Sequence, residues 1–173
     1  MGGSLVDDPT YFSYGFSGDY EPSPAFAAHS VEGNLTLSYN QTAPDGTTGC
    51  LKGVYDTAQT NNSGIIITSP LDVSRLTVGD VVLASFDIYV VDENWGTGAD
   101  NVSTTLTAFD DDKTLSLAPD QFSSFTVVAG DSFTVGSTSV PDNHIIIRWA
   151  TANRLPGAGG TFYIRNFNFS IKS

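Results

Sequence analysis

Residues 82–91 read VLASFDIYVV, and this stretch decides the fold class of the 173-residue chain. Apolar residues stand at every even position, and Ser85 and Asp87 interrupt the odd positions. Successive side chains of a β-strand point to opposite faces of a sheet, so an apolar period of two predicts a strand with one face in a core. A helix would need an apolar repeat of about 3.6 residues, which no segment of the chain sustains.

Shorter segments with the same alternation lie on both sides of this strand, separated by clusters of Gly, Pro, Asn and Asp. Such clusters favour turns, and many short strands between turns are typical of a β-sandwich or barrel. The further strands that we expect are residues 25–31, 35–40, 51–56, 64–69, 102–108, 114–117, 122–128, 132–135, 144–151 and 161–172. In the last of them the apolar residues change face halfway, which predicts a β-bulge near Arg165 or Asn166.

No linker divides the chain, so we expect one domain, with the sandwich over residues 25–173 and a distinct segment over residues 1–24. The N-terminal segment lacks clean alternation but is rich in aromatic residues, and its candidate contact residues are Tyr11, Phe12, Tyr14 and Phe16. Two interpretations stay open. The segment is an arm that exchanges between neighbouring subunits and buries aromatic surface there, or it is the first strand of its own domain.

The chain carries 19 acidic and 7 basic residues, a formal net charge of -12. Binding to a nucleic-acid backbone requires clustered Lys and Arg, so this charge argues against nucleic acid as a partner. It also argues against attraction to anionic membranes. Many of the acids stand at turns between the expected strands rather than in one block. Cys50 is the single cysteine, so no intramolecular disulfide can form, and we expect a small buried thiol.

Two segments resemble carbohydrate-binding modules with the jelly-roll, galactose-binding-like β-sandwich. Residues 76–88, LTVGDVVLASFDI, are similar to the family's turn into a central strand, and residues 160–167, GTFYIRNF, are similar to its closing strand. The resemblance implies an all-β jelly-roll sandwich of about 8–10 antiparallel strands. In many members an Asp before the Asn of the closing strand helps to hold a structural calcium ion. Arg165 stands at that position here, which puts the calcium in doubt. Related sandwiches also serve as decoration and tail modules of bacteriophages.

A surface that binds sugars needs aromatic rings to stack on and polar groups that bond to hydroxyls. Trp95 stands in a polar loop, Tyr89 ends the strand before it, and His144 and Arg148 share one face of a later expected strand. We therefore predict a platform of these four residues for a polysaccharide. The alternative is that Trp95 folds back as an anchor of its loop and that Trp149 belongs to the core.

Asp110, Asp111 and Asp112 follow one another before Lys113 and offer the hard oxygen ligands that calcium prefers. Consecutive strand residues point to opposite faces, however, and the spacing of an EF-hand loop is missing. An Asp-rich hairpin turn is the favoured interpretation. We expect no cofactor, with structural calcium as the alternative.

No motif points to catalysis, because the two histidines, His29 and His144, stand outside any nucleophile motif and no phosphate-binding glycine loop occurs. The N-terminus also lacks the basic and apolar regions of a secretory signal. We therefore expect a non-enzymatic virion protein, made in the host cytoplasm. It would be a phage capsid decoration (cement) or tail-associated module that stabilises neighbouring coat or tail subunits and forms a homo-oligomer. The alternative is a carbohydrate-binding module, extracellular as part of a secreted protein, that binds a polysaccharide.

Overall fold

The computed structural model describes residues 8–14, 26–29, 34–59, 64–67, 77–91, 93–96, 102–108, 111–117, 123, 126–136, 146–149 and 155–172. In these ranges the chain forms eleven strands: β1 (Asp8–Tyr14), β2 (Phe26–His29), β3 (Leu35–Gln41), β4 (Cys50–Tyr55), β5 (Gly64–Ile67), β6 (Val81–Val90), β7 (Val102–Ala108), β8 (Asp111–Leu117), β9 (Thr126–Thr134), β10 (Ile146–Trp149) and β11 (Thr161–Lys172). Within the same ranges there is no helix with the length and apolar character needed to span a membrane.

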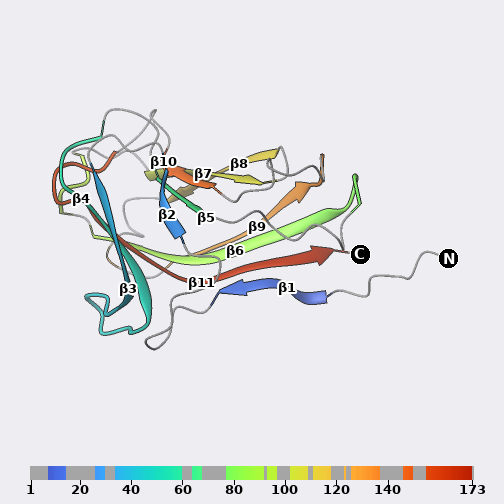
Figure 1. Cartoon of the computed structure of the whole chain (residues 1–173), viewed down its shortest axis with the longest axis horizontal. Coiled ribbons are helices and arrows are strands. Elements are labelled where there is room, and N and C mark those ends of the chain that lie inside the picture. The colour runs from blue at the N-terminus through green and yellow to red at the C-terminus, as the bar shows by residue number, and fades with distance from the viewer. Residues whose placement is uncertain are drawn as a thin grey trace.

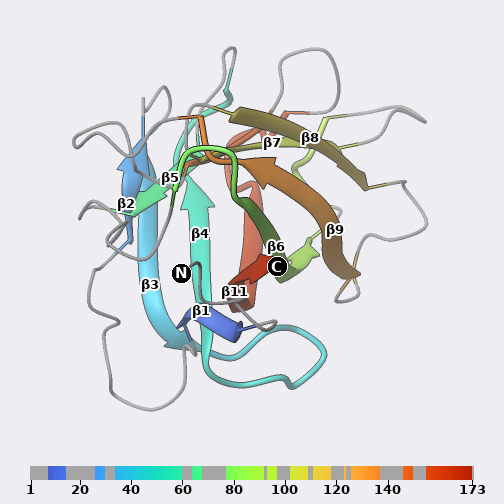
Figure 2. The same cartoon turned by 90° about the vertical axis from the view of Figure 1, so that its right-hand side faces the viewer.

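The strands form two antiparallel sheets that stack as the layers of a sandwich (Figure 1). The six-stranded sheet has the order β3-β4-β11-β6-β9, and β1 pairs with the second half of β11 while β4 pairs with the first half. The five-stranded sheet has the order β2-β5-β10-β7-β8. Figure 2 shows how β8 and β9 meet at one edge of the sandwich and β2 and β3 at the other. This is the all-β sandwich that the alternation predicts.

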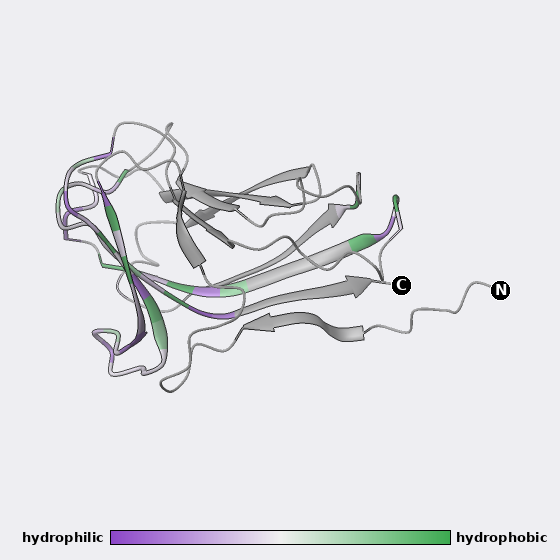
Figure 3. Ribbon diagram, viewed as in Figure 1, coloured by the Kyte–Doolittle hydropathy of each residue, from purple (hydrophilic) through white to green (hydrophobic). Residues whose placement is uncertain are grey.

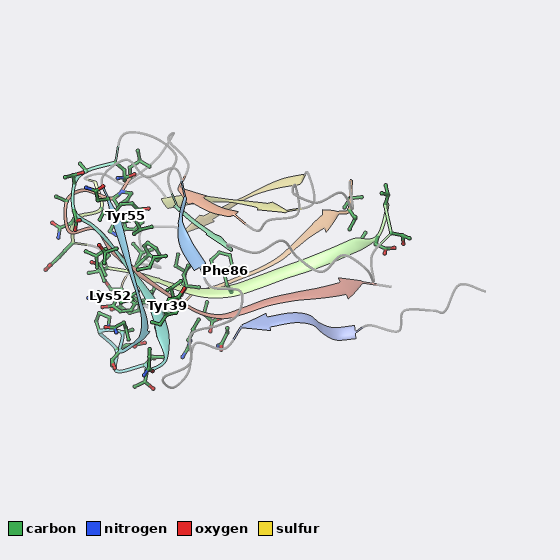
Figure 4. All side chains as sticks on the ribbon, in the orientation of Figure 1. Tyr39, Lys52, Tyr55 and Phe86 are labelled. Atoms are coloured by element: carbon green, nitrogen blue, oxygen red, sulfur yellow. The ribbon has the colours of Figure 1, made fainter. Side chains whose placement is uncertain are left out.

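One face of the six-stranded sheet carries the core of the sandwich. Ile164 pairs with Ile88 across β11 and β6, and Phe162 pairs with Val90 two residues earlier. All four side chains are at most 1% exposed. Phe86, two positions before Ile88 on the same face, points from β6 toward the second sheet (Figure 4). The opposite face of β6 and β11 is more polar. Figure 3 shows the same alternation of hydrophilic and hydrophobic residues along the neighbouring strands β3 and β4.

Gly53 in β4 makes room for an aromatic ring in this core. It pairs with Phe162, whose ring covers the position that a side chain at residue 53 would take. A Cβ at this position would stand 2.2 Å from Cζ of Phe162. Tyr55, next on the same face, lies with its ring centroid 6.4 Å from that of Phe162, and both side chains are fully buried. Glycine is therefore required here for packing rather than for an unusual backbone angle.

Most expected strands match the observed ones closely, but residues 122–128 and 132–135 do not form two strands. They belong in large part to the single strand β9, which pairs with β6 on both sides of Gly130 and Asp131. The register places Leu83 opposite Ser132 and Ser85 opposite Ala129, so two residues of β9 stand against one of β6. The Gly-Asp pair that resembled a turn is thus accommodated as a β-bulge within a continuous ladder.

The predicted bulge in the closing strand is confirmed. Arg165 pairs with Asp87 and Asn168 pairs with Ser85, so β11 has one residue more than β6 between these two pairs. Asn166 has a φ of 50° in this bulge, a left-handed conformation that asparagine tolerates better than most residues. The extra residue reverses the alternation of β11 beyond this point.

Candidate functional site

Trp95 does not lie on the surface of the protein. Its side chain is fully buried, and the indole Nε1 donates a hydrogen bond of 3.0 Å to the carbonyl oxygen of Thr161. Trp95 also forms an isolated β-bridge with Pro156, and the next amide, of Gly157, donates to the carbonyl of Asn94 at 2.6 Å. The structure thus has Trp95 as the anchor of its loop, which was the alternative in the sequence analysis, and its ring is closed to a sugar.

The other residues of the predicted platform lie in different layers or outside the described residues. Tyr89 is in β6 of the six-stranded sheet and is 5% exposed, whereas Arg148 is in β10 of the five-stranded sheet. His144 lies outside the described residues. The structure therefore does not bring Trp95, Tyr89 and Arg148 together on one exposed surface, and a binding role for His144 or Arg148 stays a prediction.

The aromatic N-terminal candidates belong in part to β1. Tyr11, Phe12 and Tyr14 are residues of this strand, and Phe12 pairs with Phe169 of β11 in the same chain. Phe16 lies outside the described residues. In this chain β1 pairs with β11, and contacts of these residues with partner subunits stay a prediction.

The acidic turn has the form of a hairpin. Asp111 pairs with Ala108 and Asp112 pairs with Thr107, so both aspartates are strand residues at the start of β8. Asp110 lies outside the described residues. In the part of the chain that the structure describes, no group of three or more His, Cys, Asp or Glu residues is placed to hold a metal ion.

We call the face of the six-stranded sheet that points away from the second sheet the outer face. Among the described residues, several aromatic and charged side chains lie together on this face. Tyr163 of β11 pairs with Tyr89 of β6 on one side and with Lys52 of β4 on the other. The two tyrosine rings meet edge to face, with centroids 6.1 Å apart and planes at 87°. Lys52 Nζ lies 5.7 Å from the centroid of the Tyr163 ring, within the range of a cation–π contact. Figure 4 shows Lys52 at the end of the sandwich where β3 and β4 lie.

The loop between β3 and β4 covers the two tyrosines. Ala43 of this loop, Cys50, Tyr89 and Tyr163 form one buried cluster, and Val91 packs against it. The loop closes on itself, because the Ala43 amide donates to Thr47 O at 2.8 Å and the Thr47 amide donates to Asp45 Oδ1 at 2.9 Å. This bond from Thr47 holds the pKa of the Asp45 carboxyl below its ordinary value, and the positive charge of Arg165 acts in the same direction. Tyr89 and Tyr163 therefore form the floor of the outer face rather than its surface.

A polar group of three residues lies beside this floor. Asp87 Oδ2 accepts a hydrogen bond of 3.0 Å from Arg165 Nε and another of 2.8 Å from Asn166 Nδ2. Neighbouring residues of a regular strand point to opposite faces, so Arg165 and Asn166 reach one carboxylate only because the bulge intervenes. The Asp87 side chain is 13% exposed and that of Arg165 33%, while Asn166 is exposed.

Sequence reasoning missed Lys52, Tyr163 and the Asp87–Arg165–Asn166 group as site residues. The bulge was a usable signal, because bulges often redirect side chains near functional sites. The pairing of β4 with β11 and of β11 with β6 was not readable, since these strands are far apart along the chain.

No protein-family model matches the chain, and no curated protein matches it in sequence. Solved structures match it in fold. The C-terminal family 22 carbohydrate-binding module of a Clostridium thermocellum xylanase aligns with a TM-score of 0.57 and 15% identity over 94% of each chain. A family 22 xylan-binding domain from Paenibacillus barcinonensis aligns with a TM-score of 0.51 and 13% identity over 92% of each chain.

The arabinose-bound α-L-arabinofuranosidase MgGH51 aligns with a TM-score of 0.55 and 12% identity over 84% of this chain. The alignment covers only 23% of that enzyme, so the chain corresponds to a small part of it. At such identities the likeness concerns the fold. This chain has the jelly-roll β-sandwich fold that carbohydrate-binding modules use.

Proposed function

We propose that the chain is a non-catalytic carbohydrate-binding module that binds a polysaccharide. The observation that supports this most is the alignment with a family 22 module over 94% of both chains, with neither chain carrying a large part that the other lacks. The alternative function from the sequence analysis is thereby favoured over the virion function. The structures named above are carbohydrate-binding modules and a glycosidase, and a coat or tail role stays a prediction without an observation in its favour.

The outer face of the six-stranded sheet is the candidate binding surface. Lys52 and Asn166 are partly or fully exposed there and offer hydrogen-bond donors, and Asn166 also offers an acceptor. Asp87 and Arg165 hold Asn166 in place through the shared carboxylate. A sugar with several hydroxyl groups can bond to such a mixture of donors and acceptors, and the Tyr163 ring gives the surface a rigid base.

The charges of this surface favour a neutral glycan. Lys52 and Arg165 balance Asp87 and the nearby Asp45, whereas the whole chain carries a net charge of -12. An acidic polysaccharide would meet repulsion from the protein as a whole without a local excess of positive charge to offset it. We therefore expect binding to neutral polysaccharides such as xylan, mixed-linkage glucan or galactan in preference to polygalacturonate.

Affinity gel electrophoresis and isothermal titration calorimetry with these four polysaccharides test the proposal. Wild type should bind at least one neutral polysaccharide. Lys52→Ala and Asn166→Ala should each weaken that binding roughly 2- to 13-fold, the effect of losing one hydrogen bond of about 0.5–1.5 kcal/mol. Val78→Ser is the matched control, because Val78 is 67% exposed in the turn before β6, at the other end of that strand from Tyr89.

Two results would contradict the proposal in different ways. Absence of binding to a broad set of neutral and acidic glycans removes carbohydrate binding as the function. Binding that Lys52→Ala and Asn166→Ala leave unchanged would keep the function but place the glycan on another surface of the sandwich.

A further inference from the structure

Arg165 places its positive charge against the carboxylate of Asp87 at the bulge of the closing strand. Arg165 Nε donates a hydrogen bond of 3.0 Å to Oδ2 of Asp87 in β6, and Asn166 Nδ2 donates one of 2.8 Å to the same oxygen. The guanidinium thus links β11 to β6 at the bulge of the closing strand.

Carboxylate and amide oxygens are also the ligands that calcium prefers, at distances of about 2.3–2.6 Å. The resemblance to carbohydrate-binding modules implies a calcium ligand at this very position of the closing strand. The residues here do not fit a calcium ion, because Arg165 carries a charge of the same sign as the ion and Asn166 turns its amide nitrogen, not its oxygen, toward Asp87. Chain position 165 therefore supplies a cation where the family pattern supplies an anion.

We propose that Arg165 serves as a built-in cation that takes the place of a structural metal ion and fastens the bulge of β11 to β6. The fold is then independent of calcium at this point. Replacing Arg165 with an acidic residue should place a second carboxylate beside Asp87 and make the same position dependent on calcium. This inference does not depend on glycan binding, because its readout is stability rather than affinity for a sugar.

The experiment compares wild type with Arg165→Asp by differential scanning fluorimetry and by calorimetric titration with CaCl2, after removal of metals with EDTA. In EDTA the variant should melt roughly 3–8 °C below wild type, because a part-buried ion pair becomes a cluster of like charges. Millimolar CaCl2 should recover about half of that loss in the variant, as expected for a site of about 10⁻⁴–10⁻³ M affinity. In wild type, Asp87 should contribute nothing to any calcium-dependent rise in melting temperature. Any such rise should therefore be the same in wild type and in Asp87→Asn.

The decisive quantity is the calcium response of Arg165→Asp minus that of wild type, because a calcium site elsewhere in the chain raises both melting temperatures equally. Arg165→Asn is the second variant, which supplies a neutral oxygen ligand and creates less repulsion, so it folds even where Arg165→Asp does not. It should show a calcium response of the same sign but smaller size. The proposal is overturned if neither variant responds to calcium more than wild type does, or if wild type has a calcium response that Asp87→Asn abolishes.

Discussion

The contact between Gly53 and Phe162 yields the sharpest prediction about stability. A methyl group added at residue 53 would stand 2.2 Å from Cζ and 2.3 Å from Cε1 of Phe162. Carbon atoms that are not bonded attract best at about 3.5–4.0 Å, so the ring would have to move by more than about 1 Å. The Phe162 ring is fully buried and packs beside Tyr55, and close-packed interiors leave little space for such a shift.

Gly53→Ala should therefore destabilise the protein although alanine suits a strand better than glycine does. Overpacking of a core costs about 1–3 kcal/mol, and removing the conformational freedom of glycine returns about 0.5–1 kcal/mol. The middle of these ranges gives a net loss of about 1–1.5 kcal/mol of unfolding free energy, which corresponds to a fall in melting temperature of roughly 2–6 °C for a chain of this length.

Urea denaturation followed by tryptophan fluorescence measures this loss, and a double-mutant cycle assigns it to the contact. In a Phe162→Leu background the ring is gone, so Gly53→Ala should cost at least about 1 kcal/mol less than in wild type. Gly46→Ala is the matched control. Its Cβ would meet nothing within 4 Å, and its cost comes from a φ of 89°, so it should be the same in both backgrounds. Equal costs of Gly53→Ala with and without the Phe162 ring would refute the packing argument.

Three further predictions concern buried and hydrogen-bonded groups. Trp95→Phe keeps an aromatic ring but removes one of the two donors to Thr161 O, to which the Val91 amide also donates at 3.0 Å, so it should lower the unfolding free energy by about 0.5–1.5 kcal/mol in the same denaturation assay. Burial raises the pKa of the Cys50 thiol, so the thiol stays protonated at neutral pH and should react with Ellman's reagent only after unfolding in urea; rapid labelling of the native protein would contradict its buried position. The hydrogen bond from Thr47 lowers the pKa of Asp45 in the folded state, so the ionised carboxylate stabilises the fold at neutral pH. This stabilisation is lost as the pH falls through the lowered pKa. Asp45→Asn should therefore lower the melting temperature at pH 7 and leave it unchanged at pH 2, as melting curves at both pH values would show.

The fold was predictable because strand alternation is a local property of the sequence. The period of two in residues 82–91 predicts β6 within one residue at each end, and the change of face after Ile164 predicts the bulge of β11. The Gly130–Asp131 pair shows the limit of such reasoning. Its composition favours a turn, but pairing with β6 continues past it and converts the turn into a bulge, a tertiary effect that no local pattern records.

The predicted platform failed at Trp95 for an equally physical reason. Its loop is polar, which suggests exposure, but a single indole can bury its ring and satisfy its N–H on a backbone carbonyl in the same step. Thr161, which supplies that carbonyl, is far from Trp95 along the chain, so the acceptor was invisible in the local sequence. The polarity of a loop therefore predicts the position of its backbone better than the position of one large side chain.

The outer face follows from the core by strand register. Phe162 and Ile164 must face the second sheet, because both are fully buried there, and Tyr163 between them is therefore turned outward. Moving β11 by one residue along β4 and β6 would place Tyr163 in the core and expose both apolar neighbours, so the register is strongly fixed. The same register brings Lys52 and Tyr89 to either side of Tyr163. The polar surface proposed for glycan binding is thus positioned by the burial of apolar residues on the opposite face, and mutations that loosen that core should weaken binding without touching a sugar.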